Sequence, residues 1–189
     1  RILPVIEDQD YEIDIEDNRN VHEFKFEKID ESLHFKKTWG PKHPLAGQPI
    51  VLRDYQVETI NKFLENPQCL QEIATGAGKT IITATLSQLI EPYGRSIVIV
   101  PNKSLVTQTE LDYKTLGLDV GVYYGERKEF DKQHTVCTWQ SLNNMLKKTK
   151  KFEAEVNIGD FLEGVVCVMV DEVHQAKADV LKTLLTGPF

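Results

Sequence analysis

The stretch QEIATGAGKTII, Gln71 to Ile82, decides how the rest of the chain is interpreted. It fits the end of the phosphate-binding pattern G-x-x-x-x-G-K-[ST], but Ile73 stands where the first glycine is expected. Such a loop needs inward-pointing backbone N–H groups, a helix N-terminus behind them, and glycines where a Cβ would collide with phosphate. Gly76 and Gly78 meet that need, and the missing glycine would lie at the strand end, farther from the phosphates. The alternative is a glycine-rich turn followed by a surface lysine.

As a phosphate loop, this stretch predicts a site for ATP with Mg²⁺. Lys79 would reach the β- and γ-phosphates, and Thr80 would offer its hydroxyl to the metal. The residues expected to bind the nucleotide here are Thr75, Gly76, Ala77, Gly78, Lys79 and Thr80.

A second element, VVCVMVDEVHQ (residues 165–175), ends an apolar strand with two adjacent carboxylates, Asp171 and Glu172. Carboxylates are costly to hold at the end of a buried strand without a cation. Asp171 is therefore predicted to hold Mg²⁺, and Glu172 to orient and deprotonate the attacking water. An exposed acidic turn would explain each carboxylate, but not their coincidence with the loop.

A third element is Gln56 in LRDYQ, upstream of the loop. A glutamine amide can form a bidentate pair with N6 and N7 of adenine. The alternative is a solvated glutamine on a helix.

The hydrophobic pattern predicts strands alternating with helices of about ten residues, and therefore a parallel sheet with right-handed crossovers. Ligands of such sheets bind at the carboxyl ends of the strands. The expected strands are 69–73, 96–101, 120–125, 135–139 and 164–172. The expected helices are 53–65, stopped by Asn66-Pro67, 79–90, 104–113 with Ser104 as a possible cap, 141–148 and 178–185.

The first 46 residues differ from the rest. Residues 1–40 hold eleven acidic side chains against six Lys or Arg, and residues 11–17 and 23–29 alternate as strands do. A stretch rich in Pro and Gly, residues 38–49, reads as a linker. We expect an acidic, strand-rich accessory segment with a linker at 1–46 and the main domain at 47–189.

Composition and charge limit how the protein can bind nucleic acid and in which compartment it is expected. The net charge of −7 excludes a uniformly basic nucleic-acid coat, although a basic strip can sit on an acidic protein. The run KKTKK (residues 147–151) is either such a contact or a solvated helix end. Neither a membrane span nor a secretory signal is evident, and three scattered cysteines suit a reducing compartment. We therefore expect a cytoplasmic protein, in the host cytoplasm if it is phage-encoded.

Together these elements resemble the first RecA-like domain of superfamily 2 DExH helicases. ATGAGKT resembles motif I, in which the early glycine is commonly replaced, DEVH resembles motif II, and RDYQ resembles the adenine-reading element. IVIVPNKSLVTQ is similar to motif Ia, and TWQSL to the following DNA-side element. The resemblance runs from about residue 50 to the end. It is strongest to the UvsW-type phage recombination helicases, followed by XPB-like helicases and restriction-enzyme motor subunits.

The resemblance implies a RecA-like P-loop NTPase fold and an ATP-dependent DNA helicase. Its implied work is the remodelling of branched DNA or RNA–DNA hybrids in recombination, repair or origin control. The implied catalytic residues are Lys79, Glu172 and His174, with His174 linking the γ-phosphate to the DNA side, and Arg53 joins Gln56 at adenine. The implied nucleic-acid track consists of Pro101, Asn102, Lys103, Thr107, Thr138, Trp139 and Gln140. Trp139 would stack on a base there or belong to the core.

Motif III and a second RecA-like domain with its arginine finger are not recognisable in these residues. Such a finger accelerates turnover by about 10³–10⁵-fold, so we expect the chain alone to bind ATP–Mg²⁺ weakly and hydrolyse it poorly. Two other functions stay open: a duplex-DNA translocase such as a restriction motor, and a nucleotide-gated binding module whose N-terminal segment docks a partner.

Overall fold

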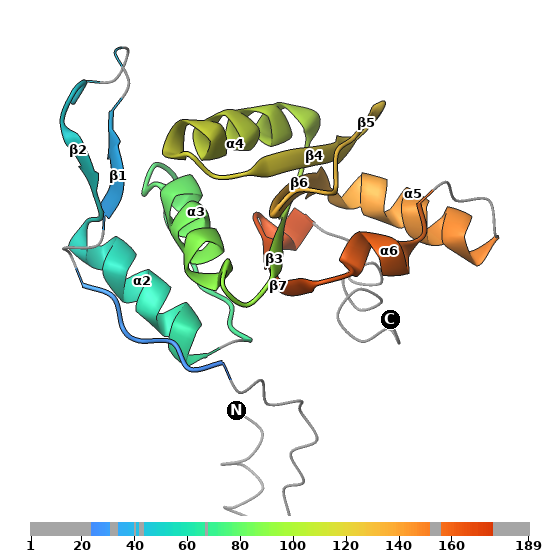
Figure 1. Cartoon of the computed structure of the whole chain (residues 1–189), viewed down its shortest axis with the longest axis horizontal. Helices are drawn as coiled ribbons and strands as arrows, with labels where there is room; N and C mark the ends of the chain where they lie inside the picture. Colours follow the sequence, from blue (N-terminus) through green and yellow to red (C-terminus); the bar gives the residue numbers. More distant parts are fainter. Residues whose placement is uncertain are drawn as a thin grey trace, which may run out of the picture.

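The computed structural model describes residues 24–30, 34–39, 41, 44–66, 68–151 and 156–175. Its centre is a five-stranded sheet with the strand order β5-β4-β6-β3-β7 (Figure 1). These strands are β3 (Arg95–Val100), β4 (Val120–Tyr124), β5 (Arg127–Lys128), β6 (His134–Thr138) and β7 (Val165–Val170). The helices are α2 (Asp54–Glu65), α3 (Lys79–Ile90), α4 (Lys103–Leu116), α5 (Trp139–Lys150) and α6 (Ile158–Leu162), and a 3₁₀ turn, η1 (Val173–Gln175), follows β7.

Four strands of this sheet are parallel, as the sequence predicted. β6 pairs with β3 and β4, and β7 pairs with β3, all in parallel. The short edge strand β5 pairs with β4 in the antiparallel direction, so the sheet as a whole is mixed. Because parallel strands end at the same edge, the residues that follow β3, β6 and β7 are brought to one side of the molecule.

The alternation of side chains along β3 builds a core on each face of the sheet. Val98 and Val100 belong to a buried cluster with residues of α3 and α4. Ile97 and Ile99 belong to a second cluster with residues of α5 and α6. A strand buried on both faces has to be apolar throughout, which explains the run RSIVIV.

The observed helix boundaries follow local chemistry. α2 ends at Glu65, directly before Asn66-Pro67, as predicted. α4 begins one residue earlier than expected, because the side chain of Asn102, rather than that of Ser104, accepts a hydrogen bond from the N–H of Leu105 at 3.0 Å. The helix then ends at Leu116, and the residue that caps it, Gly117, has a φ of 86° that suits glycine.

Two predicted strands are wrong. Residues 69–73 form no strand, since β7 pairs only with β3 and, within the described residues, no neighbouring strand is available to them. Residues 24–29 are also not a strand. Instead they lie along α2, where the Asn61 amide bonds both the N–H and the carbonyl of Ile29, each at 2.9 Å. The strand expected at 11–17 and the helix expected at 178–185 fall outside the described residues.

A small second sheet precedes α2. It pairs β1 (His34–Thr38) with β2 (Pro49–Val51) in the antiparallel direction. The predicted linker closes this pair, because Trp39 donates its N–H to the carbonyl of Gln48 at 2.9 Å and accepts from the N–H of Gly47 at 3.0 Å. The division of the chain at residue 46 stays a prediction.

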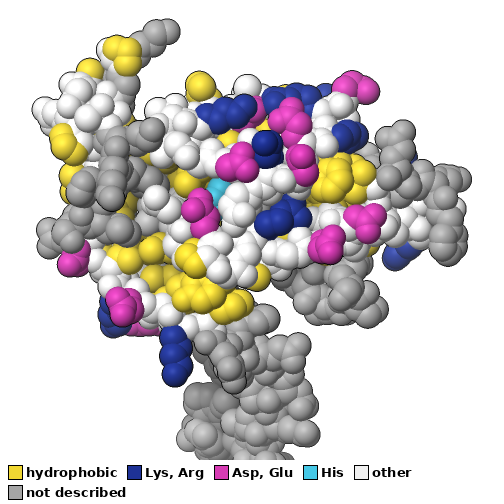
Figure 2. Space-filling model, in the orientation of Figure 1, with side chains coloured by type: hydrophobic (Ala, Val, Ile, Leu, Met, Phe, Trp, Pro, Cys, Tyr) yellow, Lys and Arg dark blue, Asp and Glu magenta, His cyan; other side chains and the backbone are white. Residues whose placement is uncertain are grey.

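The visible surface mixes charges rather than gathering one sign. Figure 2 shows basic and acidic side chains interspersed over α4 and the β4–β5 hairpin. One such group joins the two elements: Glu110 of α4 pairs with Arg127 at 2.7 Å, and Arg127 also pairs with Glu129 at 2.9 Å. Of the helices in the described residues, none has the length and apolar character needed to cross a membrane.

Candidate nucleotide site

Gly76 and Gly78 of the loop differ in what constrains them. Gly76 and Gly78 both have left-handed φ values, 82° and 79°, which other residues adopt only with strain. A Cβ on Gly76 would meet no atom within 4 Å, whereas a Cβ on Gly78 would lie 2.7 Å from Nε2 of Gln56. A side chain at Gly78 would therefore have to displace the Gln56 amide in addition to straining the backbone turn into α3.

The hydrophobic core explains why isoleucine, rather than glycine, stands at position 73. Ile73 is half-buried and packs against the cluster that α3 and α4 share with the sheet. The position that carries glycine in the general pattern thus serves here as an apolar anchor below the loop.

Lys79 meets both carboxylates that follow β7. Its Nζ lies 2.7 Å from Oε1 of Glu172 and 3.8 Å from Oδ1 of Asp171, and the three side chains are between 25% and 30% exposed. The hydrogen bond to Glu172 raises the pKa of Lys79, and the same bond lowers the pKa of Glu172. The chain thus brings together groups that are 93 residues apart, at the edge of the sheet where the sequence placed them.

The backbone at Glu172 shapes this contact. The N–H of Asp171 still bonds the carbonyl of Ile99 at 2.9 Å, so the ladder between β7 and β3 continues to that residue. Glu172 then adopts a φ of 51°, the one positive value among the described non-glycine residues. A left-handed non-glycine residue costs about 1–3 kcal/mol and is typical of functional sites. Sequence reasoning had no signal for this bend.

His174 lies on the other side of the glutamate. Its Nδ1 is 3.5 Å from Oε2 of Glu172, and its side chain is 70% exposed. One oxygen of Glu172 therefore faces the lysine of the loop, and the other faces the histidine.

The donor set suits a magnesium ion bound together with phosphate. Mg²⁺ prefers oxygen ligands and is usually held by one or two protein groups plus phosphates and water. Thr80 and Asp171 supply a hydroxyl and a carboxylate of that kind.

The predicted adenine residues make protein contacts. Gln56 is 4% exposed, its Oε1 accepts from the N–H of Arg53 at 2.9 Å, and its Nε2 donates to the carbonyl of Ala77 at 3.0 Å. Adenine would have to replace one of these bonds. Sequence reasoning missed Tyr55, whose hydroxyl donates to the same carbonyl at 3.0 Å.

The expected nucleic-acid track is only partly on the surface. Asn102, Lys103, Thr107 and Gln140 are exposed, whereas the side chains of Pro101 and Thr138 are buried. Gln140 donates to the carbonyl of Pro101 at 3.3 Å, which ties the segments after β3 and β6 together. Trp139 is half-buried and packs against the cluster beneath α5 and α6.

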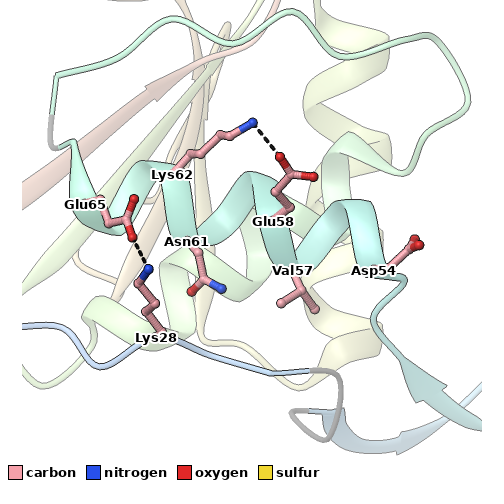
Figure 3. A pocket seen from close by; sticks show the side chains of 7 residues that line it. All are labelled: Lys28, Asp54, Val57, Glu58, Asn61, Lys62 and Glu65. Atoms are coloured by element: carbon pink, nitrogen blue, oxygen red, sulfur yellow. Dashed lines mark hydrogen bonds and ion pairs between the residues drawn. The ribbon is translucent and has the colours of Figure 1, made fainter.

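Two hollows accompany these elements. An open groove of about 400 Å³ runs along α2 beside Lys28, and its walls carry the ion pairs Lys28–Glu65 and Lys62–Glu58 (Figure 3). It lies away from the loop. A smaller hollow of about 240 Å³ reaches Gly78 and Thr80 and is bordered by Trp39 and Ile50.

Comparison with known proteins identifies a family and several relatives. The family described as "Type III restriction enzyme, res subunit" matches residues 49–186. "DNA 3'-5' translocase XPB2" of Sulfurisphaera tokodaii is 32% identical over 99 residues, which are 52% of this chain and 22% of that protein. "Protein translocase subunit SecA" of Buchnera aphidicola subsp. Schizaphis graminum is 26% identical over 151 residues, 72% of this chain and 17% of that protein. The chain thus spans about a fifth of the length of these curated relatives.

Solved structures agree on the fold. A crystal structure of the UvsW helicase from bacteriophage T4 matches with a TM-score of 0.62 and 20% identity, over 82% of this chain and 52% of that one. A second structure of T4 UvsW matches with a TM-score of 0.53 and 17% identity, over 81% and 35% of the two chains. The predicted α/β fold, a sheet with flanking helices, is confirmed by this likeness.

Proposed function

Because the chain belongs to the type III restriction enzyme res subunit family, we propose that it is the ATP-binding domain of an ATP-dependent DNA helicase. The observation that carries the proposal is the meeting of Lys79 with Glu172 and Asp171 beside a glycine loop that opens a helix. ATP and Mg²⁺ are the proposed cofactors.

In this proposal each residue has a defined task. The backbone N–H groups of Thr75, Gly76 and Gly78 and the side chain of Lys79 hold the phosphates. The N–H of Ala77 instead bonds the carbonyl of Ala74 at 3.2 Å. Thr80 and Asp171 hold Mg²⁺, which would neutralise charge on the phosphate oxygens. Glu172 accepts the proton of the water that attacks the γ-phosphate.

The ion pair between Lys79 and Glu172 suggests that nucleotide binding precedes activation of the catalytic base. In the structure Lys79 occupies one oxygen of Glu172 and lowers the pKa of that carboxyl. An incoming triphosphate offers the lysine stronger anionic partners. Once Lys79 has left, the pKa of Glu172 rises toward its usual value, and the carboxylate becomes a better base. Nucleotide binding thus prepares the base.

DNA is the proposed substrate, contacted through its backbone and therefore independently of sequence. The exposed side chains of Asn102, Lys103 and Gln140 offer polar contacts at the edge of the sheet that also carries the loop. We propose branched DNA or RNA–DNA hybrids in recombination and repair as the specific targets, on the strength of the motif resemblance.

The direct test is Glu172→Gln in the full-length protein. ATP hydrolysis is expected to fall at least about 100-fold while ATP binding persists, because general base catalysis is lost and the phosphate contacts are not. Glu58→Gln, which changes an exposed glutamate on α2, is the matched control and should retain activity. A nucleotide-gated binding module would show no hydrolysis to lose.

A duplex-DNA translocase is the second candidate, favoured by the family description and by the name of the relative from Sulfurisphaera. Displacement of a labelled strand from a forked duplex, compared with displacement of a triplex-forming strand, separates the two on the full-length protein. Translocation without unwinding selects the translocase. The match to SecA makes one further control necessary: ATP hydrolysis that DNA does not stimulate would contradict both DNA-based proposals.

A further inference from the structure

The carbonyl of Ala77 accepts two hydrogen bonds from neighbouring residues of one helix. The Tyr55 hydroxyl and the Gln56 Nε2 both donate to it, each at 3.0 Å. Both donors lie in the first turn of α2, more than twenty residues before Ala77. A carbonyl oxygen has two lone pairs, so this pair of donors fills its capacity.

Fixing this carbonyl also fixes the amide on the other side of the same peptide unit. A trans peptide is planar, and its C=O and N–H point in opposite directions. With the Ala77 oxygen turned toward α2, the N–H of Gly78 points away from α2. That N–H donates to no other described residue, and it directly precedes the N–H groups of Lys79 and Thr80, which lie too early in α3 to have an acceptor within the helix.

We infer that Tyr55 is a positioning residue for the phosphates of the nucleotide, acting through the 77–78 peptide. The inference rests on the proposed function and names a residue that touches the loop without touching the ligand. Its hydroxyl holds the peptide so that the Gly78 N–H is presented to a diphosphate or triphosphate. The base and the sugar take no part in this effect.

Tyr55 suits this role better than Gln56 does. Gln56 also bonds the Arg53 N–H at the start of α2 and is buried, so its removal disturbs the helix itself. Tyr55 is half-buried, and its hydroxyl accepts a hydrogen bond from the Arg53 guanidinium at 3.1 Å. A cationic donor of this kind polarises the hydroxyl and strengthens the bond that it donates to Ala77.

Tyr55→Phe removes the hydroxyl and leaves the ring in place. Tyr93→Phe is the matched control, because the Tyr93 hydroxyl also donates to a backbone carbonyl, that of Lys25 at 3.3 Å, away from the loop. Titration calorimetry of the full-length protein would measure binding of ADP–Mg²⁺ and of inorganic tripolyphosphate–Mg²⁺, a probe without base or sugar. Thermal unfolding of each variant is recorded alongside.

We expect Tyr55→Phe to weaken both ligands by the same factor, about two- to tenfold, as the loss of one hydrogen bond predicts. Its unfolding midpoint and all values for Tyr93→Phe should stay near those of the wild type. Unchanged affinities overturn the inference, and so does a loss confined to ADP, which would make Tyr55 a contact of the base. A wild-type protein that binds neither ligand would instead refute the proposed function, and the inference with it.

Discussion

At the level of single residues, the two glycines of the loop allow the energetic cost of a strained backbone to be distinguished from the cost of a steric clash. Both have φ near 80°, but only Gly78 lies against a neighbour, Gln56. Gly76→Ala is therefore expected to cost about 1–2 kcal/mol of unfolding free energy, the penalty of a left-handed alanine. Gly78→Ala should cost clearly more and should also weaken nucleotide binding, because its Cβ displaces the amide that holds Ala77.

Urea unfolding of the two glycine variants checks this prediction, with Gly76→Ala as the internal control. An equal loss of stability in both would mean that Gln56 moves aside freely, and that α2 does not brace the loop.

The residues of the site differ in how far sequence predicts them. The meeting of Lys79 with Asp171 and Glu172 was predicted from the pairing of the two motifs, and it occurs although the strand expected to lead into the loop, residues 69–73, is not formed. The bend at Glu172 and the hydroxyl contact of Tyr55 were not predicted, because both depend on how distant segments pack. Gln56 was singled out for adenine, yet the bonds that it makes are to the protein's own backbone.

At the scale of elements, a buried carboxylate joins α4 to β5. Glu110 is 6% exposed and accepts from both Nη atoms of Arg127, at 2.7 and 2.8 Å, and from Lys114 at 2.6 Å. Hydrogen bonds from Arg127 lower the pKa of Glu110 to about 2, against the opposing effect of its burial. Because the folded pKa lies below the unfolded one, this stabilisation is present above pH 4.5 and is lost as the pH falls toward 2.

Glu110→Gln should therefore lower the unfolding free energy at pH 7 by at most about 3 kcal/mol, a ceiling that solvent screening of the half-exposed Arg127 reduces. The difference between variant and wild type should shrink as the pH falls toward 2. Urea unfolding at pH 7 and at pH 3 measures both quantities, with Glu58→Gln as an exposed control. A difference independent of pH would exclude the charge as its cause.

A second contact between elements ties residues 24–30 to α2. Asn61 bonds both polar groups of the Ile29 backbone, and the rings of Phe24 and Phe26 lie 4.9 and 5.1 Å from that of Tyr93. Asn61→Ala removes both hydrogen bonds, each worth about 1 kcal/mol, and should free this segment. Trypsin should then cleave after Lys25 and Lys28 about thirtyfold faster, because about 2 kcal/mol of local stability is lost.

Asn66→Ala is the control for that digestion, since among the described residues the Asn66 side chain bonds only the carbonyl of Lys62, at the end of the same helix. Equal cleavage rates in the two variants would mean that the aromatic cluster alone holds the segment.

Helices and strands were predictable where the hydrophobic pattern of the segment was sufficient to define them without knowledge of their neighbours. The apolar runs of β3 and β7 and the helix of α3 appear where the sequence placed them. Residues 69–73 have strand composition, but a strand exists only beside a partner, and sequence composition does not reveal whether one is present. Residues 24–29 alternate for a different reason, since their alternate side chains and backbone groups meet α2 and Tyr93.

At the scale of the whole molecule, two cores of side chains hold a sheet whose carboxyl edge carries the loop, both carboxylates and the exposed polar residues after β3 and β6. In the proposed function, this arrangement would contact phosphate from one side only. Rapid hydrolysis of a triphosphate also needs positive charge against the γ-phosphate from the opposite side, which a second RecA-like domain would provide. The chain covers only 52% and 35% of the two UvsW chains that it matches, so both of these proteins contain further residues that this sequence does not match.

We therefore expect the 189 residues alone to hydrolyse ATP at least about 10³-fold more slowly than the full-length protein, which is the lower limit for the loss of an arginine finger. The same chain should still bind ADP–Mg²⁺, because Lys79, Thr80 and the loop backbone are all present. Steady-state phosphate release with and without DNA, measured beside calorimetric binding, tests both statements on one preparation. Lys79→Ala is the control that should abolish binding as well. Strong DNA-stimulated turnover by the chain alone would show that the charge needed opposite the γ-phosphate comes from within these residues.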